Sequence, residues 1–355
     1  MIGIIIKIHS DFYYVRADNN VFECKIRERL KKENIEIYVG DRVKLEEINT
    51  VSNQAVIANI EDRKNFIQRP AIANIDQIVL IASLDQPKLD FNQLDRYLVN
   101  IRIHNIPVVI CINKYDLEDN QHIKNLLIST YEPLGYKIIF TSAISGLGLD
   151  EMKNVLDSKI SVFSGASGVG KSSLLNKLHP GLTLKTKEIS PKTLRGTHAT
   201  RHSELIDIPL DHGKISQVAD TPGFSYLKFD NIMPNDIKDL FSEIHELSQD
   251  CYYNNCLHLE ETGCNVLKNL NNISSSRYES YKAFVNEALG YKEKISQTGH
   301  KVEKNYKNKD IGDKEKIKII KVSSQSREKS RSTHKQKLNF ISDISSLDDI
   351  SYNND

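Results

Sequence analysis

The sequence predicts a multidomain fold with a small N-terminal β-barrel, a central α/β domain and a C-terminal α-helical domain that binds a metal. Three observations lead to this prediction. Short alternating apolar runs fill residues 1–70, buried runs alternate with amphipathic helices up to residue 228, and three cysteines and a histidine lie close together beyond that point. The chain has 355 residues, of which 39% are hydrophobic, so it can form several cores.

Residues 1–70 are expected to form an OB-like barrel, because five short strand patterns are separated by turn residues. The expected strands are 3–8, 12–17, 21–26, 38–45 and 54–60. A partly open five-stranded barrel of this kind commonly binds oligonucleotides. A basic stretch beside the third strand favours contact with RNA, although a solvated loop is the alternative interpretation. Its residues are Lys25, Arg27, Arg29, Lys31 and Lys32.

Residues 71–228 show the pattern of a doubly wound parallel sheet, in which buried strands alternate with helices. Strands are expected at 77–83, 106–112, 137–140, 160–163 and 215–219, and helices at 91–105 and 172–178. Residues 183–202 lack periodicity and are expected to form a mobile loop.

Residues 229–292 are predicted to be helical, with one helix at 235–248 and two apolar stripes that flank the cysteine cluster. Residues 293–355 form a polar tail that we expect to be disordered. Residues 301–337 contain thirteen Lys or Arg against five Asp or Glu, so the tail could alternatively add non-specific phosphate contacts.

The composition excludes a membrane protein and a uniformly basic one. The formal net charge is +1, so any polyanionic partner must meet local basic patches. The longest apolar run, 106–112, is too short to span a bilayer, and the N-terminus is typical of a strand and not of a signal peptide. We therefore expect a cytoplasmic protein without membrane contact.

A glycine-rich segment after the strand at 160–163 matches the phosphate-binding loop pattern in full. Its glycines allow successive backbone N–H groups to converge on phosphate oxygens at the start of a helix, while Lys171 reaches the β- and γ-phosphates and Ser172 binds Mg²⁺. The predicted phosphate-binding residues are Gly165, Ala166, Ser167, Gly168, Val169, Gly170, Lys171, Ser172 and Ser173.

A second acidic motif, Asp220-Thr-Pro-Gly223, follows the strand at 215–219. Asp220 is placed to hold a water of Mg²⁺ and Gly223 to meet the γ-phosphate, although an ordinary turn has the same residues. The functional interpretation of this motif is favoured because the motif follows the phosphate-binding loop by about fifty residues.

Two further segments predict selection of guanine. Asn113, Lys114, Tyr115 and Asp116 follow one buried strand, and Ser142 and Ala143 follow the next. An aspartate can accept from N1–H and the exocyclic amine of guanine, whereas adenine offers no donor at position 1. The Lys114 stem can cover one face of the base, and the amides of Ser142 and Ala143 can meet the guanine O6. An ATPase or a kinase is disfavoured by Asp116.

The order of these motifs is permuted relative to ordinary small GTPases, in which the phosphate-binding loop comes first. Together with the barrel and the cysteine-rich end, this order resembles the ribosome small subunit-dependent GTPase family, RsgA, also called YjeQ. The resemblance covers residues 1–292 and includes Gly-Asp-Arg-Val at 40–43 and Leu-Asp-Arg-Tyr-Leu-Val at 94–99. It implies a circularly permuted GTPase that acts late in small-subunit maturation and contacts ribosomal RNA through its barrel and zinc domain.

The cluster Cys251-x4-Cys256-x-His258-x5-Cys264 supplies three thiolates and one imidazole. This set fills a tetrahedral Zn²⁺ and leaves no open position, so we expect one structural zinc ion. Free thiols or redox sensing are the alternatives. Similar spacing in the resembling family makes His258 the fourth ligand.

The switch segment departs from the family, whose members resemble His-Thr-Thr-Thr where this chain has Thr197-His198-Ala-Thr200. Alignment on His198 assigns Thr200 to Mg²⁺ and the γ-phosphate, with Thr197 as the alternative. The position after Gly223 is Phe224, which cannot orient water as the glutamine of Ras-like GTPases does. The family resemblance implies that His198 takes that catalytic role, and His202 is a weaker candidate.

These features and the resemblance predict an Mg²⁺-dependent enzyme that hydrolyses GTP to GDP and phosphate, is stimulated by the small ribosomal subunit, and binds that subunit and its RNA as a monomer. The alternative is a nucleotide-gated RNA-binding module with negligible turnover, which GTP turnover measured with and without subunits would distinguish.

Overall fold

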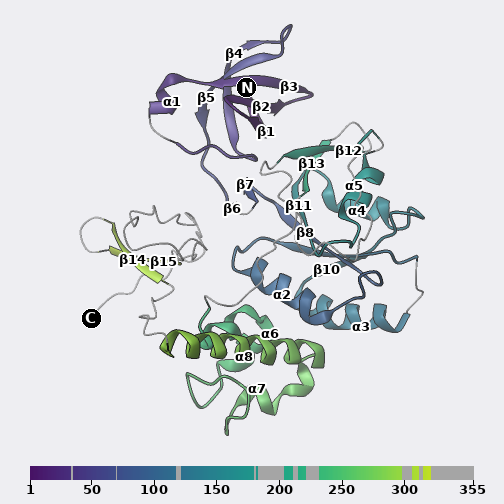
Figure 1. Cartoon of the computed structure of the whole chain (residues 1–355), viewed down its shortest axis with the longest axis vertical. Coiled ribbons are helices and arrows are strands. Elements are labelled where there is room, and N and C mark those ends of the chain that lie inside the picture. The colour runs from purple at the N-terminus through teal and green to yellow at the C-terminus, as the bar shows by residue number, and fades with distance from the viewer. Residues whose placement is uncertain are drawn as a thin grey trace. The chain divides into compact units, whose positions relative to one another are not determined.

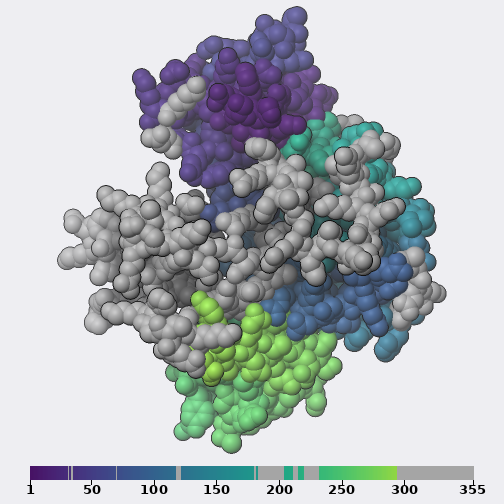
Figure 2. Space-filling model, in the orientation of Figure 1, coloured from purple at the N-terminus to yellow at the C-terminus, as the bar shows by residue number. Residues whose placement is uncertain are grey.

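The computed structural model describes residues 1–32, 35–68, 70–116, 121–179, 181–182, 204–210, 215–220, 232–297, 306–311 and 315–320 (Figure 1). In the space-filling view, the coloured surface belongs to described residues (Figure 2). The chain forms two compact units. The first contains residues 1–90 and 106–225, and the second contains residues 91–105 and 226–355.

The first unit begins with a five-stranded barrel whose strand order is β1-β2-β3-β5-β4. Its strands are β1 (Ile2–His9), β2 (Phe12–Ala17), β3 (Asn20–Ile26), β4 (Arg42–Asn49) and β5 (Gln54–Ile60), with the short helix α1 (Glu28–Lys32) after β3. The sequence predicts a partly open barrel, but antiparallel pairing of β1 with β4 closes it. Alternate side chains such as Ile5, Phe22 and Ile57 fill its core.

The fourth strand begins at Arg42 and not at residue 38, because residues 38–41 form a turn. The buried carboxylate of Asp41 accepts from the Tyr38 amide at 2.8 Å and from Arg63 Nε at 2.7 Å. Gly40 has a φ of +90°, and a Cβ there would collide with the carbonyl of Ala73. A glycine is therefore required where the barrel meets the hairpin β6 (Phe66–Gln68) and β7 (Ala71–Ala73).

The α/β domain contains a six-stranded sheet in the order β10-β9-β8-β11-β13-β12. The strands are β8 (Gln77–Ser83), β9 (Val108–Asn113), β10 (Lys137–Phe140), β11 (Ile160–Ser164), β12 (Leu205–Pro209) and β13 (Ile215–Asp220). All neighbours are parallel except β12, an edge strand that pairs antiparallel with β13. The sequence did not predict β12, because five residues that end in proline have a weak strand signal.

Among the described residues of the first unit, three helices and one short 3-10 helix accompany this sheet. They are α3 (Gln121–Tyr131), η1 (Glu132–Leu134), α4 (Leu149–Leu156) and α5 (Lys171–Leu178). Met152, Leu156, Leu174 and Leu178 from these helices pack in one buried cluster with strand residues of the sheet such as Phe163.

The second unit is mostly helical. It contains α2 (Phe91–Arg102), η3 (Pro234–Leu240), α6 (Ser242–Ser248), α7 (Asn265–Lys268), η4 (Leu270–Asn272) and α8 (Ser275–Gln297). Helix α2, which the sequence analysis placed in the α/β domain, shares a buried cluster with Phe241, Tyr281 and Phe284 through Val99. The predicted helix at 235–248 is divided, because Phe241 has an extended conformation between η3 and α6.

The C-terminal tail contains more regular structure than its composition predicts. Helix α8 continues past residue 292 to Gln297, and β14 (Tyr306–Ile311) pairs antiparallel with β15 (Glu315–Ile320). Among the described residues, no helix is long and apolar enough to cross a membrane.

A buried ion-pair network joins α2, α6 and α8. Arg277 is 2% exposed, and its guanidinium contacts Asp95 and Glu243, each at 2.7 Å. It also lies 4.4 Å from the ring centre of Phe241. Burial alone would lower the pKa of Arg277, but the two carboxylates raise it, so the guanidinium stays charged.

We expect Asp95→Ala to lower the free energy of unfolding by about 3–5 kcal/mol, because it leaves the buried Arg277 charge undercompensated. Chemical denaturation followed by circular dichroism measures this change. The control is Glu279→Ala, which breaks the exposed Lys282–Glu279 pair on α8, the helix that carries Arg277. It should lower the free energy of unfolding by less than about 1 kcal/mol. Equal losses in both variants would contradict a special role for the buried network.

Candidate nucleotide site and metal centre

The phosphate-binding loop lies between the central strand β11 and helix α5, which begins at Lys171. Gly165 and Gly170 have φ angles of +140° and +96°. A Cβ on Gly165 would collide with the carbonyl of Ile81, and one on Gly170 would collide with Asn113 Nδ2. The loop can pass close to two neighbouring strands only because these positions have no side chain.

Lys171 lies over this loop and donates to the carbonyls of Gly165 and Ala166 at 2.8 and 2.9 Å. Ser172 and Ser173 follow in the first turn of α5, where they are half-buried. The N-terminal amides of a helix and its dipole favour an anion at this place. The predicted phosphate-binding residues are thus brought together at one end of a helix.

Asn113 connects the phosphate-binding loop to the loop that is predicted to bind the base. It is the last residue of β9 and is 1% exposed. Its Nδ2 donates to the carbonyl of Val169 at 2.8 Å, and its Oδ1 accepts from Thr141 Oγ1 at 3.2 Å. Both polar atoms of the side chain are therefore satisfied, and the ends of β9 and β10 are connected to the phosphate-binding loop.

The residues after Asn113 turn sharply. Lys114 has a φ of +61°, and its ammonium donates to the carbonyl of Gln86. Burial lowers the pKa of Lys114, against the opposing effect of Asp85 and Asp116. The Tyr115 amide donates to the carbonyl of Thr141 at 3.1 Å, and the Asp116 side chain is exposed. The carboxylate of Asp116 is thus accessible to a base.

Ser142 and Ala143 follow β10 beside this turn. The Ser142 amide already donates to the carbonyl of Leu147 at 3.0 Å, and its hydroxyl accepts from the amides of Ile144 and Ser145 at 3.2 and 3.0 Å. The amide and the hydroxyl of Ser142 therefore both shape the loop that follows β10.

The second acidic motif is described only in part. The backbone of Asp220, the last residue of β13, pairs in register with Phe163 of β11, which places it two residues from the start of the phosphate-binding loop. Gly223, Phe224, Thr197, His198, Thr200 and His202 lie outside the described residues.

The predicted metal ligands converge in the second unit. One ligand atom from each of Cys251, Cys256, His258 and Cys264 lies within 4.8 Å of the others. His258 Nδ1 is 3.3 Å from the sulfur of Cys264 and 3.6 Å from that of Cys251. Three sulfurs, which are soft donors as thiolates, and one imidazole nitrogen supply four ligands, so these residues fit a tetrahedral metal ion such as Zn²⁺.

The backbone around the cluster supports bound thiolates. The amides of Asn265 and Leu267 donate to the sulfurs of Cys251 and Cys264 at 3.3 and 3.4 Å. Burial raises the pKa of Cys256 to about 12 and lowers that of His258 to about 4. The imidazole is therefore neutral, as a ligand must be, whereas the Cys256 thiol needs a cation to release its proton.

Helix α8 holds in place the segment 251–264, which carries the four metal ligands and is called the knuckle below. Tyr278 Oη donates to the carbonyl of His258 at 2.8 Å, and Tyr281 Oη donates to that of Leu257 at 2.9 Å. The Glu261 carboxylate accepts from the amides of Leu257 and Leu259 at 2.6 and 2.8 Å. These hydrogen bonds fix the backbone between Cys256 and Cys264 without the help of a metal ion.

Sequence reasoning missed Thr141 and Gln86, which orient Asn113 and Lys114. Thr141 could have been found as a fully buried polar residue directly after a strand, beside a loop with binding residues. Gln86 acts through its backbone carbonyl, so no side-chain pattern indicates it.

The barrel, the permuted order of the strands and the phosphate-binding loop beside Asn-Lys-Tyr-Asp define a circularly permuted P-loop nucleotide-binding protein. A family model described as RsgA GTPase matches residues 60–230, and one described as RsgA N-terminal domain matches residues 2–57. The chain belongs to the RsgA GTPase family. The predicted family and fold class are therefore confirmed.

Named relatives and solved structures agree with this assignment. A relative from Geobacillus sp. (strain WCH70), named small ribosomal subunit biogenesis GTPase RsgA, is 43% identical over 80% of this chain and 96% of its own length. A relative of the same name from Alkaliphilus metalliredigens is 39% identical over 80% of this chain and 97% of its own length.

The crystal structure of YjeQ from Thermotoga maritima is 35% identical, with a TM-score of 0.68 over 81% of this chain and 98% of that chain. The structure of YloQ, described as a circularly permuted GTPase, is 34% identical, with a TM-score of 0.65 over 81% of this chain and 95% of that chain.

We expect Asn113→Ala to weaken guanine-nucleotide binding by about tenfold to a hundredfold, because it leaves the Val169 carbonyl unpaired and releases the base loop from the phosphate loop. Titration with a fluorescent GDP analogue measures the affinity. Asn125→Ala, which removes the exposed Gln121–Asn125 hydrogen bond on α3, is the matched control. An unchanged affinity of Asn113→Ala would show that the two loops do not act as one site.

Proposed function

We propose that this protein hydrolyses GTP to GDP and phosphate and uses the reaction in late maturation of the small ribosomal subunit, which stimulates it. The observation that carries the proposal is the Asn113–Val169 hydrogen bond, which holds a guanine-type loop against a phosphate-binding loop in a member of the RsgA family. The names of the relatives supply the biological context.

GTP is bound by two groups of residues in this proposal. Lys171 leaves the carbonyls of its own loop for the β- and γ-phosphates, which the backbone amides of residues 165–173 surround. Ser172 and Thr200 hold Mg²⁺, which neutralises phosphate charge when bound. Asp220 holds a water of Mg²⁺, and the Gly223 amide donates to the γ-phosphate. Thr197 is the alternative to Thr200.

The base is selected by hydrogen bonding. Asp116 accepts from N1–H and the exocyclic amine of guanine, and the Ala143 amide donates to O6, since the Ser142 amide is engaged with Leu147. Tyr115 packs 5.0 Å from the Phe140 ring, which keeps the turn beneath the base in place.

The attacking water is oriented by His198. A phenyl ring at Phe224 cannot do so, and a neutral imidazole both accepts and donates hydrogen bonds. His202 is the weaker candidate. We expect slow turnover without the subunit, because positioning of the water limits phosphoryl transfer.

The ion in the second unit is a single structural Zn²⁺. The cluster has four protein ligands and therefore no open position at which a metal could act on a substrate. Its contribution is to the folding of the knuckle between α6 and α7.

Ribosomal RNA is the proposed partner of the barrel and the knuckle. Lys25, Arg27 and Arg29 are exposed beside β3, although Arg27 is paired with Glu46 at 2.9 Å. The barrel, the nucleotide site and the metal cluster all belong to one chain, so we expect the protein to act as a monomer in the cytoplasm, where subunits mature.

Cys256→Ser should remove the bound zinc and lower the melting temperature of the second unit. Elemental analysis by mass spectrometry is expected to find one zinc ion per parent chain and none or little in the variant, because a hydroxyl is a poor substitute for a thiolate. Cys24→Ser, a buried cysteine of the barrel, is the control and should keep its zinc. Zinc retained in Cys256→Ser would contradict the ligand assignment.

GTP turnover with and without isolated small ribosomal subunits tests the function itself. The parent should be slow alone and strongly stimulated by subunits, and His198→Ala should lose most of that stimulation while its GTP affinity and subunit binding stay unchanged. A parent rate near zero in both conditions would instead indicate a binding module. Full stimulation of His198→Ala would remove this residue from the mechanism.

A further inference from the structure

The turn that is predicted to bind the base carries an aromatic side chain at its centre. Tyr115 lies between Lys114 and Asp116 and is half-buried. Its ring centre is 5.0 Å from that of Phe140, at an interplanar angle of 58°. Phe140 is the last residue of β10, so it leads directly into the second loop that is predicted to contact the base. A pair of rings therefore joins the two base-binding loops.

Hydrogen bonds hold the beginning of the same turn. The Tyr115 amide donates to the carbonyl of Thr141 at 3.1 Å, and Thr141 Oγ1 donates to Asn113 Oδ1 at 3.2 Å. The turn is thus tied to the end of β10 at Asn113 and at Tyr115. The side chain of Asp116, one residue further on, is exposed. Its position depends on how firmly the neighbouring Tyr115 is held.

A lysine of helix α3 lies over both rings. The ammonium of Lys124 is 5.2 Å from the ring centre of Phe140 and 5.8 Å from that of Tyr115. Lys124 belongs to the first turn of α3 and is half-buried. An aromatic face attracts an ammonium at such distances, and the attraction is stronger when the cation is partly removed from water. One cation therefore contacts one ring from each base-binding loop.

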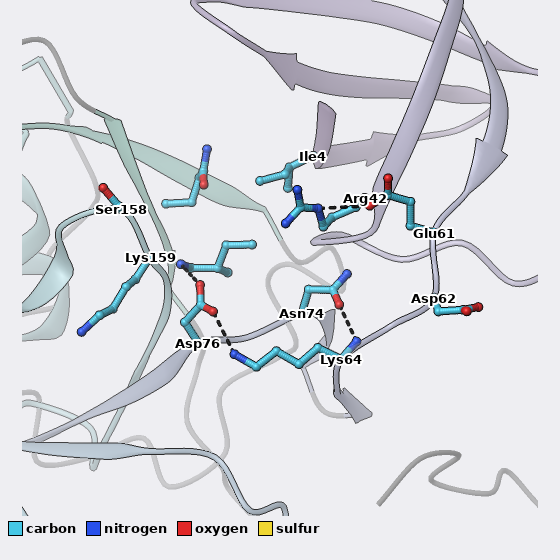
Figure 3. Close-up of a pocket in the computed structure, with 11 residues that line it drawn as sticks. Ile4, Arg42, Glu61, Asp62, Lys64, Asn74, Asp76, Ser158 and Lys159 are labelled. Atoms are coloured by element: carbon cyan, nitrogen blue, oxygen red, sulfur yellow. Dashed lines mark hydrogen bonds and ion pairs between the residues drawn. The ribbon is translucent and has the colours of Figure 1, made fainter. Parts of the chain in front are cut away.

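The cations of the polar cleft between the barrel and the beginning of β11 have different partners (Figure 3). This cleft of about 400 Å³ includes Ile160, at the other end of β11 from the phosphate-binding loop. Its Arg42 pairs with Glu61 at 3.2 Å, and its Lys64 pairs with Asp76 at 3.1 Å. Carboxylates thus balance these charges, whereas the ammonium of Lys124 faces aromatic rings beside the base-binding turn.

We propose that Lys124 is a positioning residue for guanine selection. Its ammonium holds the rings of Tyr115 and Phe140 together and thereby fixes the turn that presents Asp116. The inference rests on the proposed function, because it takes Asp116 as the group that accepts from N1–H and the exocyclic amine of guanine. It assigns a role in base selection to α3, a helix outside the nucleotide-binding motifs.

Positioning and structural roles can be separated by comparing two nucleotides. Inosine diphosphate keeps the N1–H of GDP but lacks the exocyclic amine, so the ratio of the two affinities reports how well Asp116 is placed. A purely structural role of Lys124 would lower the melting temperature and weaken both nucleotides equally. A positioning role would lower the preference for GDP while the fold stays intact.

The experiment titrates the full-length protein with GDP and with inosine diphosphate in a calorimeter. We expect Lys124→Met to weaken GDP binding about threefold to tenfold, and inosine diphosphate binding less, with a nearly unchanged melting temperature. Methionine keeps an unbranched side chain and removes the charge. Lys124→Arg should bind GDP within about twofold of the parent affinity, because a guanidinium is also attracted by aromatic faces.

Lys282→Met is the matched control. It removes an ammonium that lies 5.1 Å from the ring centre of Tyr278 in the second unit. Its GDP affinity and its preference for GDP should equal those of the parent.

A double variant, Tyr115→Leu with Lys124→Met, tests whether the two side chains act together. Because Lys124 acts through the Tyr115 ring, the double variant should weaken GDP binding by less than the product of the two single effects.

Parental GDP affinity in Lys124→Met would overturn this inference and leave the proposed function intact. Equal weakening of GDP and inosine diphosphate would also overturn it, because base selection would then not be what Lys124 affects. So would a double variant whose loss equals the product of the single losses. A parent protein that binds inosine diphosphate as tightly as GDP would overturn the proposed role of Asp116, and the inference with it.

Discussion

One buried hydrogen bond, from Asn113 Nδ2 to the carbonyl of Val169, connects the phosphate-binding loop to the loop that is predicted to bind the base. The loops are distant in sequence but lie at the carboxyl ends of parallel strands, where such sheets place their ligands. Gly170 has no side chain at the point where Asn113 must pass. Because Thr141 satisfies the remaining oxygen of Asn113, the bond is also fixed in direction.

The same sheet explains how the permuted order remains functional. Strand β11 lies in the centre of the sheet, beside β8 and β13. Which loops meet depends on this spatial order of the strands and not on their order along the chain. Permutation does change the connections to the second unit. The chain enters that unit after β8, as residues 91–105, and again after residue 225, close behind the second acidic motif. The Arg277–Asp95 pair then joins these two separate entries in one helical core.

Much of this organisation could be predicted from the sequence because it is local. The phosphate-binding loop, the base-binding turn and the four metal ligands are short motifs whose geometry follows from adjacent residues. Contacts between distant residues could not be predicted. Asp95 and Arg277 are 182 positions apart, and Arg16 and Asp207 are 191 positions apart, so no periodic pattern connects them. Helix α2 shows the consequence, since its stripe indicates a buried face but not the partner that covers it.

We propose that the nucleotide bound at the site that includes Asn113 and Lys171 governs association of the protein with the small ribosomal subunit. Sedimentation of the protein with isolated small and large subunits, in the presence of a non-hydrolysable GTP analogue, GDP or no nucleotide, tests it most directly. We expect co-sedimentation with the small subunit in the presence of the analogue, and much weaker association with GDP or with the large subunit. Equal association in all nucleotide states, or preference for the large subunit, would contradict it.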